Sequence, residues 1–189
     1  MVDVPLRCSC GSVQGMASNV SAKSGVRLTC YCDDCQKFAQ YLGRSDILDE
    51  YGGTDIFQIT PSQIKFTQGS EQLRCVRLKE KGLFRWYTEC CKTPIGNTIS
   101  AGMAFIGTIH NIMDDDSVRD QNLGPRRGNV HSKFAIKPIP GEKKPSSFPL
   151  GLLAKIFLKM FIWKIKGMHR PSPFFDKNGQ PVVKPTVLK

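Results

Sequence analysis

Seven of the eight cysteines of this chain fall into three short clusters. A thiolate is a strong zinc ligand, and cysteines this close in sequence can reach one ion without the closure of a long loop. Three thiolates leave one position of a tetrahedral zinc ion open, so that a water, a thiol or a substrate can bind there. The clusters consist of Cys8 and Cys10, of Cys30, Cys32 and Cys35, and of Cys90 and Cys91.

Redox work and structural disulfides are the two other uses of such cysteines. A C-x-C pair such as Cys8 and Cys10, or an adjacent pair such as Cys90 and Cys91, forms an internal disulfide only under strain. The amino terminus has no charged start followed by an apolar run, so we expect a cytoplasmic protein in a reducing compartment. Because clustered thiols in such a compartment more often bind metal than form disulfides, we favour zinc.

Length and charge limit the other classes of function. The 189 residues suffice for one domain with an appendage, and a hydrophobic content of 40% is normal for a folded soluble protein. The net charge of +11 favours acidic partners, which include nucleic acid, anionic lipid and small acidic substrates. Nucleic acid is disfavoured, because the basic residues are spread along the chain and do not interleave with aromatic residues in a recognisable module.

The segments that carry the cysteines predict a mainly β fold. Val26, Leu28 and Cys30 alternate with polar residues, which indicates a strand leading into the second cluster. A short helix is expected at 35–40, with Asp33 and Asp34 capping its free amides. Cys75 is predicted to be a buried apolar residue, and 114–116 a turn or helix cap. Further strands are predicted within 6–20, which also includes a turn, and at 56–59, 64–67, 73–79, 84–87 and 103–112.

A basic, glycine-rich loop runs from Gly124 to His131. Arg126 and Arg127, together with Lys133, are candidates for binding substrate carboxylates through charge-assisted hydrogen bonds. His131 is one of only three histidines and is a candidate to shuttle a proton in catalysis. A solvated surface loop is the competing interpretation, because charge clusters and single histidines are weak signals.

The carboxyl-terminal part of the chain changes character. Residues 138–150 contain four prolines and are expected to form a linker. Residues 151–166 predict a helix that is apolar almost all round, with Lys155, Lys159 and Lys166 on one narrow stripe. This helix is too short and too rich in lysine to span a membrane comfortably. It could lie on a membrane surface, or it could pack against its own domain or a second copy of the chain, which we favour because its apolar arc is wide.

These observations predict three parts of the chain. Residues 1–137 would form the zinc-binding domain, 138–150 the linker, and 151–189 an amphipathic helix with an extended tail. Phe174 and Phe175 are expected to anchor that tail to the body of the protein.

The cysteine framework as a whole resembles the glutathione-dependent formaldehyde-activating family. The motifs of that family run C-x-C-G near the start, then C-x-C-x-x-C, then F-C-x-x-C-G-T-P. This chain has C-S-C-G at 8–11, C-Y-C-D-D-C at 30–35 and Y-T-E-C-C-K-T-P at 87–94. The resemblance covers about residues 6–112 and implies a β-rich, Mss4-like zinc-binding fold. The tail is also similar to that of an uncharacterised subgroup related to the family.

The third motif departs from the family pattern. Thr88 occupies the place of its first cysteine, and Lys92 occupies the place of its glycine. Either Cys90 supplies the missing ligand, or the structural site is incomplete, or one zinc ion is shared between both groups. Adjacent cysteines in an extended backbone start in different directions and therefore chelate one ion poorly.

The resemblance implies a carbon–sulfur lyase that acts on the adduct of an aldehyde and a thiol such as glutathione. A zinc ion with an open position would lower the pKa of the bound thiol. The alternative is a zinc-stabilised module without catalysis that binds a protein or a membrane surface, which the loss of a cysteine at Thr88 favours. In the family pattern Cys8, Cys10 and Cys91 would hold a structural zinc ion, and Cys30, Cys32 and Cys35 would hold a catalytic one.

Overall fold

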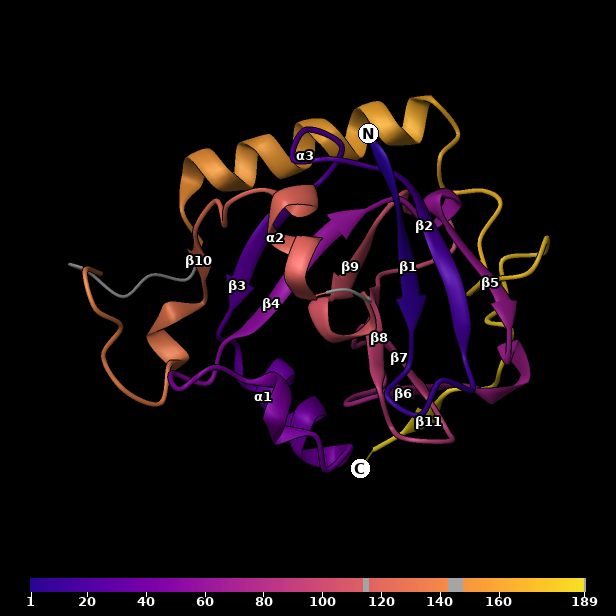
Figure 1. Ribbon diagram of the computed structural model, residues 1–189, viewed down its shortest axis with the longest axis horizontal. Helices are drawn as coiled ribbons and strands as arrows, with labels where there is room; N and C mark the ends of the chain where they lie inside the picture. The colour runs from indigo at the N-terminus through magenta and orange to yellow at the C-terminus, as the bar shows by residue number, and fades with distance from the viewer. Residues whose placement is uncertain (114–115, 143–147, 189) are drawn as a thin grey trace.

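The computed structural model describes residues 1–113, 116–142 and 148–188. Within these residues the chain is mainly β, as its sequence predicts. A smaller sheet has the strand order β1-β2-β5, and a larger sheet has the order β10-β3-β4-β9-β8-β7-β6-β11 (Figure 1). The strands are β1 (Val2–Arg7), β2 (Gln14–Val20), β3 (Val26–Cys30), β4 (Thr54–Ile59), β5 (Ile64–Gln68), β6 (Leu73–Arg77), β7 (Phe84–Thr88), β8 (Pro94–Thr98), β9 (Ile106–Ile109), β10 (Asn129–Val130) and β11 (Thr186–Val187).

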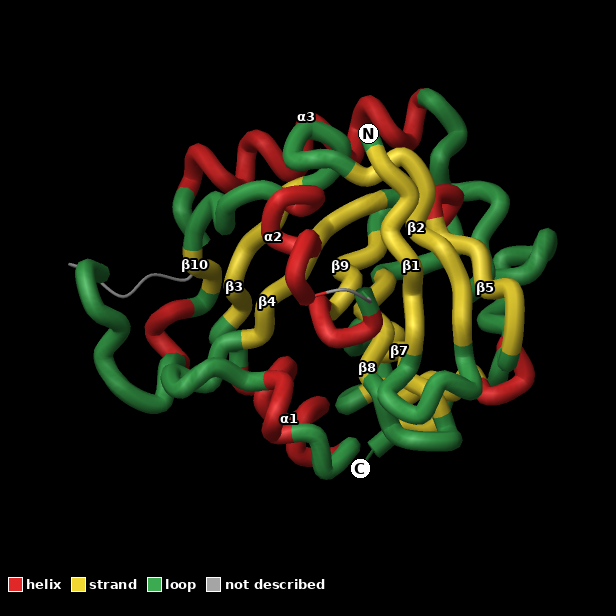
Figure 2. The backbone as a smooth tube through the Cα atoms, in the orientation of Figure 1, coloured by secondary structure: helices red, strands yellow, loops and turns green. Residues whose placement is uncertain are grey.

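The main core lies between the two sheets, with the smaller sheet in front of the larger one in Figure 2. Leu6 of β1 and Trp86 of β7 are almost fully buried in this core, because alternate residues of each strand point inward. Phe174 and Phe175 of the tail also enter it, and their ring centroids lie 5.1 and 5.7 Å from that of Trp86. The expectation that these two phenylalanines anchor the tail is confirmed. Cys75 is buried in the same core, as predicted.

Two helices cover the other face of the larger sheet. The helix α1 (Asp33–Tyr41) packs through Phe38 and Ala39 against residues of β6, β7 and β9. The helix α3 (Leu150–Ile165) packs on the part of the sheet that is formed by β3 and β4. A third helix, α2 (Asp116–Leu123), lies before the basic loop. We call the side of the larger sheet that α1 and α3 cover the outer face, and the side that faces the main core the inner face.

Some elements differ from the sequence predictions. The residue before α1 is Cys32, and Asp33 and Asp34 lie within the first turn, so they do not cap the helix from outside. The strand β8 was not predicted, because Pro94–Thr98 carries a proline, a glycine and an asparagine and is buried on both faces. The strand predicted at 103–112 is shorter, since β9 ends at Ile109 and a 3₁₀ turn follows.

Other predictions fall partly outside the described residues. The turn or cap expected at 114–116 includes 114–115, and the linker expected at 138–150 includes 143–147. The division of the chain into three parts therefore stays a prediction. Among the helices of the described ranges, none combines the length and the apolar character that are needed to cross a bilayer.

Candidate metal centres

Four sulfurs meet where the smaller and larger sheets come together. Cys8 and Cys10 follow β1, whereas Cys90 and Cys91 lie in the turn between β7 and β8. The Sγ atoms of this four-cysteine cluster lie within 4.8 Å of one another. The separation is 3.6 Å for Cys8 and Cys10, and 3.8 Å for Cys8 and Cys90. The backbone N–H of Val13 also donates to the Cys8 sulfur over 3.2 Å. The cluster joins segments that are 82 residues apart.

The turn explains how two adjacent cysteines converge. Our expectation that they would diverge applies to an extended backbone, but residues 89–91 form a turn. Lys92 follows with a φ of 54°, a left-handed conformation that favours glycine, at the position where the resembling motif has glycine. The structure therefore brings Cys90 and Cys91 to the same cluster, and it separates this cluster from the group of Cys30, Cys32 and Cys35.

Hydroxyl groups surround Cys91. Burial tends to raise the pKa of Cys91, but hydrogen bonds from Thr88, Thr93 and the Cys10 backbone outweigh it and lower that pKa to about 5. The Thr88 and Thr93 Oγ1 atoms lie 3.5 and 3.1 Å from the Cys91 sulfur. Thr88, which replaces the first cysteine of the motif, thus acts on the same cluster as a hydrogen-bond partner.

The remaining group, the three-cysteine cluster, is built from one short segment on the outer face. Cys30 ends β3, Cys32 precedes α1, and Cys35 lies in the first turn of α1 (Figure 1). The Cys30 sulfur lies 3.4 Å from that of Cys32 and 3.8 Å from that of Cys35. The turn is closed by the backbone N–H of Cys35, which donates to the Cys32 carbonyl over 3.0 Å. Cys30 and Cys35 are buried, whereas Cys32 is partly exposed.

A buried arginine that the sequence did not reveal faces this cluster. Arg85 of β7 is only 2% exposed, and its guanidinium lies 3.8 Å from the Cys35 sulfur and 3.8 Å from the Asp34 carboxylate. Hydrogen bonds from Cys30 and Cys32 lower the pKa of Cys35 well below its usual value, and the charge of Arg85 adds to this effect against the opposing effect of burial. Since a buried guanidinium needs a countercharge, the cluster is suited to carry negative charge.

Polar side chains accompany Arg85 on the outer face. Thr54 pairs with Cys30 across β3 and β4, so their side chains point to the same face. The Thr54 Oγ1 atom is buried and has no hydrogen-bond partner among the described residues. Gln58 of the same strand and Asn97 of β8, whose Oδ1 atom accepts a hydrogen bond from Arg85 over 3.3 Å, are also buried. The Thr54 hydroxyl is thus a buried polar group that lacks a hydrogen-bond partner in the described residues, on the face that carries Cys30.

The distances between the sulfurs fit a bound metal ion. Zinc–sulfur bonds of about 2.3 Å in a tetrahedron place the sulfurs about 3.8 Å apart. The closest sulfur contacts in the two clusters are 3.4 to 3.8 Å. All eight cysteines are free, and a disulfide would need a separation of about 2.05 Å. Both clusters could therefore hold a metal ion.

The two arginines of the basic loop contact different parts of the chain. The Arg126 guanidinium is 3.2 Å from the Asp55 carboxylate. Asp55 points to the inner face, because the preceding residue of β4 pairs with Cys30 on the outer face. Arg127 is exposed, and its charge, together with burial, lowers the pKa of Lys159 in α3. The structure thus places Arg126 with Asp55 and Arg127 beside α3.

His131 follows a strand that pairs directly with the end of β3, where the three-cysteine cluster begins. Val130 of β10 pairs in parallel with Cys30, and His131 is the next residue, with a φ of 56°. The Lys133 ammonium lies 4.8 Å from the ring centroid of Phe134. The roles of His131 in proton transfer and of Lys133 in substrate binding stay predictions.

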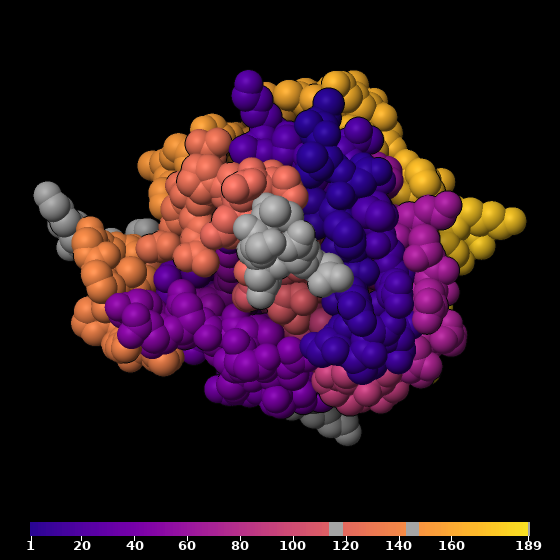
Figure 3. All heavy atoms as spheres, in the orientation of Figure 1, coloured from indigo at the N-terminus to yellow at the C-terminus, as the bar shows by residue number. Residues whose placement is uncertain are grey.

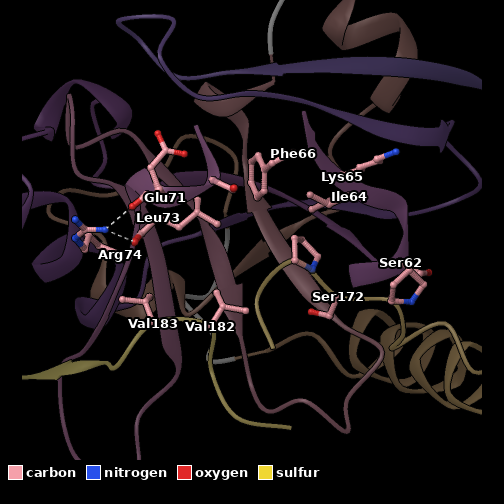
Figure 4. A pocket seen from close by; sticks show the side chains of 13 residues that line it. Ser62, Ile64, Lys65, Phe66, Glu71, Leu73, Arg74, Ser172, Val182 and Val183 are labelled. Carbon is pink, nitrogen blue, oxygen red and sulfur yellow. Dashed lines mark hydrogen bonds between the residues drawn. The ribbon is translucent and has the colours of Figure 1, made fainter. Parts of the chain in front are cut away.

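An open cavity of about 830 Å³ lies between β5, β6 and the carboxyl-terminal tail. Figure 4 shows Phe66 and Lys65 on one side of it and Val182 and Val183 on the other, with Arg74 at one end. None of the described residues that line it is a cysteine, so this cavity is distinct from both clusters.

Comparisons with known proteins identify a family but no activity. No curated protein matches the sequence. A crystal structure of a Rhodobacter sphaeroides protein, determined as a structural genomics target, shares 15% identity and a TM-score of 0.45, covering 67% of this chain and 99% of that one. Neither this structure nor the family match names the formaldehyde-activating family. Residues 1–185 match the family described as "Family of unknown function (DUF6151)". The chain belongs to the DUF6151 family.

Proposed function

We propose that this protein binds zinc at both cysteine clusters and uses the three-cysteine cluster to activate a small thiol for reversible addition to an aldehyde. The sulfur separations of 3.4 to 3.8 Å carry this proposal, because they match the edges of a zinc–thiolate tetrahedron. The motif resemblance to the formaldehyde-activating family supports the choice of reaction.

The numbers of sulfurs suggest different roles for the two ions. Four thiolates complete a tetrahedron, which is typical of a structural site. The four-cysteine cluster joins β1 of one sheet to the β7–β8 turn of the other, so its ion would hold the sheets together. Three thiolates leave a position for an exogenous ligand, which is typical of a site that does chemistry.

The reaction is an addition without net oxidation. The thiol loses its proton, the sulfur forms a bond to the carbonyl carbon, and the carbonyl oxygen gains a proton to become a hydroxyl group. The reverse reaction breaks the same carbon–sulfur bond. Zinc in the open site would supply a lowered thiol pKa, and hence a thiolate at neutral pH.

Residues of the chain would support each step. Arg85 would balance the negative charge of the thiolates, since it is buried within 3.8 Å of the Cys35 sulfur. Thr54 would donate its free hydroxyl to a ligand beside Cys30. His131 is the candidate to return the proton to the oxygen. Arg126 would take no part in these steps, because its guanidinium is paired with Asp55 toward the inner face.

Metal analysis tests the first part of the proposal. Purified, fully reduced protein should contain one equivalent of zinc for each cluster, measured by inductively coupled plasma mass spectrometry. The Cys32→Ser variant should lose the equivalent of the three-cysteine cluster, whereas Cys75→Ala should lose none, since Cys75 belongs to neither cluster. Protein without zinc after careful reduction would contradict the proposal.

An exchange experiment tests the second part. Magnetization-transfer NMR with ¹³C-formaldehyde and glutathione measures how fast the adduct forms and breaks. The protein should accelerate this exchange, and Cys32→Ser should abolish the acceleration while Cys75→Ala retains it. A protein with full zinc and no acceleration would instead be the non-catalytic binding module.

A further inference from the structure

One side of α3 is buried and the opposite side is an exposed apolar surface. Leu152, Ile156, Met160 and Trp163 form the stripe that packs on the larger sheet. Figure 1 shows α3 along one edge of the molecule, where no described element covers its outer side, and Figure 3 shows its orange side chains on that rim. The exposed apolar residues are 41% to 82% accessible and are Leu150, Phe157, Leu158, Phe161, Ile162 and Ile165.

Lysines flank this apolar surface on both sides. At ~100° per residue, the exposed apolar residues cover an arc of about 140° opposite the buried stripe. Lys164 lies at one edge of the arc, whereas Lys155, Lys159 and Lys166 lie at the other, as their predicted stripe requires. An apolar arc between lysines whose stems can extend toward polar surroundings is typical of helices that lie in a membrane interface.

The region around α3 is basic without acidic residues in its sequence. No aspartate or glutamate occurs between Glu142 and Asp176. Burial, together with the charges of Arg127 and Lys155, lowers the pKa of Lys159. The positive charge begins at the second turn of α3 and continues past its carboxyl end to Lys166 and Arg170.

We propose that α3 docks the protein on a membrane surface that contains anionic lipid. The apolar arc enters the boundary between headgroups and acyl chains, and the flanking lysines contact lipid phosphates and carboxylates. The ammonium groups of Lys159 and Lys164 donate to the Lys23 and Gly102 carbonyls in the structure, and they would exchange these acceptors for lipid oxygens on docking. Charge argues against a second copy as the occupant, because two such helices would bring lysines together with no acidic residue of the 143–175 segment to pair with them. This inference is independent of the thiol chemistry, because it rests on the opposite side of α3 from the sheet.

Vesicle sedimentation of the full chain tests the docking. Vesicles of phosphatidylcholine alone should bind weakly, and vesicles in which one third of the lipid is phosphatidylserine should bind strongly, with binding reduced by salt. The double variant Phe157→Ser and Phe161→Ser should lower the partition coefficient about 100-fold, because each phenylalanine buries a large apolar area. Phe134→Ser is the matched control, since Phe134 is also exposed but lies on another surface. It should bind as the unmodified protein does.

The lysines are tested separately. Lys155→Gln and Lys164→Gln should each weaken binding to the anionic vesicles about fivefold, whereas Lys65→Gln, on the exposed side of β5, should not. Circular dichroism melting should show that all variants remain folded, because the changed residues are exposed. Equal binding of the double phenylalanine variant, or no binding of the unmodified protein to anionic vesicles, would overturn the proposal. A dimer in light scattering that Phe161→Ser dissociates would overturn it in favour of a second copy.

Discussion

The two cysteine clusters differ in what they connect. The four-cysteine cluster joins segments 82 residues apart on two sheets, and two of its members, Cys10 and Cys90, are exposed. The three-cysteine cluster closes only six residues of one segment, and Arg85 is buried beside it. Closing a long separation restricts the unfolded chain more than closing a short one. The four-cysteine cluster therefore matters chiefly to the stability of the fold. The three-cysteine cluster contributes less to stability, so the buried charge of Arg85 beside it points to a role in binding.

The largest effect is expected from Cys10→Ser. Cys10 is exposed, so this change would alter stability little unless its sulfur holds a metal ion between the sheets. We expect the melting temperature to fall by more than about 10 °C, because the loss of a structural zinc ion removes folding energy directly. Cys32→Ser should lower it by only a few degrees. Calorimetry that shows equal falls in melting temperature for both variants would contradict the distinction between the clusters.

Asp55→Asn should destabilise the fold without removing metal. Asp55 is buried and its carboxylate lies 2.6 Å from the Arg27 guanidinium. Breaking a buried ion pair by removing one partner costs about 3–5 kcal/mol in the free energy of unfolding. Urea denaturation and metal analysis together check this: full zinc content with reduced stability is expected. Loss of zinc from this variant would show that metal retention merely follows stability.

The effect of Asp55 should depend on pH. Burial tends to raise the pKa of Asp55, but hydrogen bonding and the charge of Arg27 outweigh it and hold the pKa below its usual value. A carboxyl group whose pKa is lower in the folded state contributes stability above its unfolded pKa of about 3.9 and loses it as the pH falls. The difference in unfolding free energy between Asp55→Asn and the unmodified protein should therefore be constant above about pH 5 and shrink below about pH 4. A difference that grows toward acid pH would contradict this assignment.

Arg85→Met should weaken metal binding at the three-cysteine cluster alone. Groups around metal ligands typically change metal affinity by about 10- to 100-fold when they are replaced, and Arg85 is the cation beside Cys35. In competition with a zinc chelator, Arg85→Met should release one of its two equivalents of zinc more readily than the unmodified protein does. Arg77→Met is a matched control, because Arg77 lies on the neighbouring β6 and packs over Phe84, 4.7 Å from its ring centroid. Unchanged release in Arg85→Met would leave the buried charge without a role at the metal.

The smallest effect is expected from Lys92→Gly. Glycine relieves the left-handed backbone at φ 54°, which costs other residues roughly 1–2 kcal/mol. The half-exposed ion pair between Lys92 and Glu89 is lost, which offsets part of the gain. We expect a rise of less than about 1 kcal/mol in the free energy of unfolding and full zinc content. Asn19→Gly, at another left-handed residue far from the cysteines in sequence, is the control. A loss of zinc would show that Lys92 supports the cluster through its side chain.

The sequence predicted the strands whose residues are rich in β-branched and aromatic side chains or alternate between apolar and polar. The strand at Val26–Cys30 was predicted with the bounds that β3 has, and the strand at 84–87 differs from β7 by one residue. The strand β8 is buried on both faces, as β3, β4 and β9 are, but it carries a proline, a glycine and an asparagine, which are typical of turns and hid the strand. The predicted helix at 151–166 corresponds closely to α3, but burial on one stripe only could not be predicted from a helix that is apolar almost all round.

The site was predictable as a set of thiols but not as an environment. Short spacings in sequence are enough to group Cys30, Cys32 and Cys35. The convergence of Cys90 depends on the conformation of a turn, which the motif did not reveal because its glycine is replaced by Lys92. Arg85 is a charged residue within a strand, and such residues usually face solvent, so only the packing of α1 over β7 shows that it is buried.

The aromatic pair Phe174 and Phe175 has a consequence for biosynthesis. These rings complete the interior around Trp86, yet every clustered cysteine is translated by residue 91. During synthesis, all the thiols of both clusters are therefore present long before Phe174 and Phe175, which complete the core. Metal capture on the ribosome would precede closure, and the unsealed intermediate would expose Trp86 to chaperones until the tail arrives.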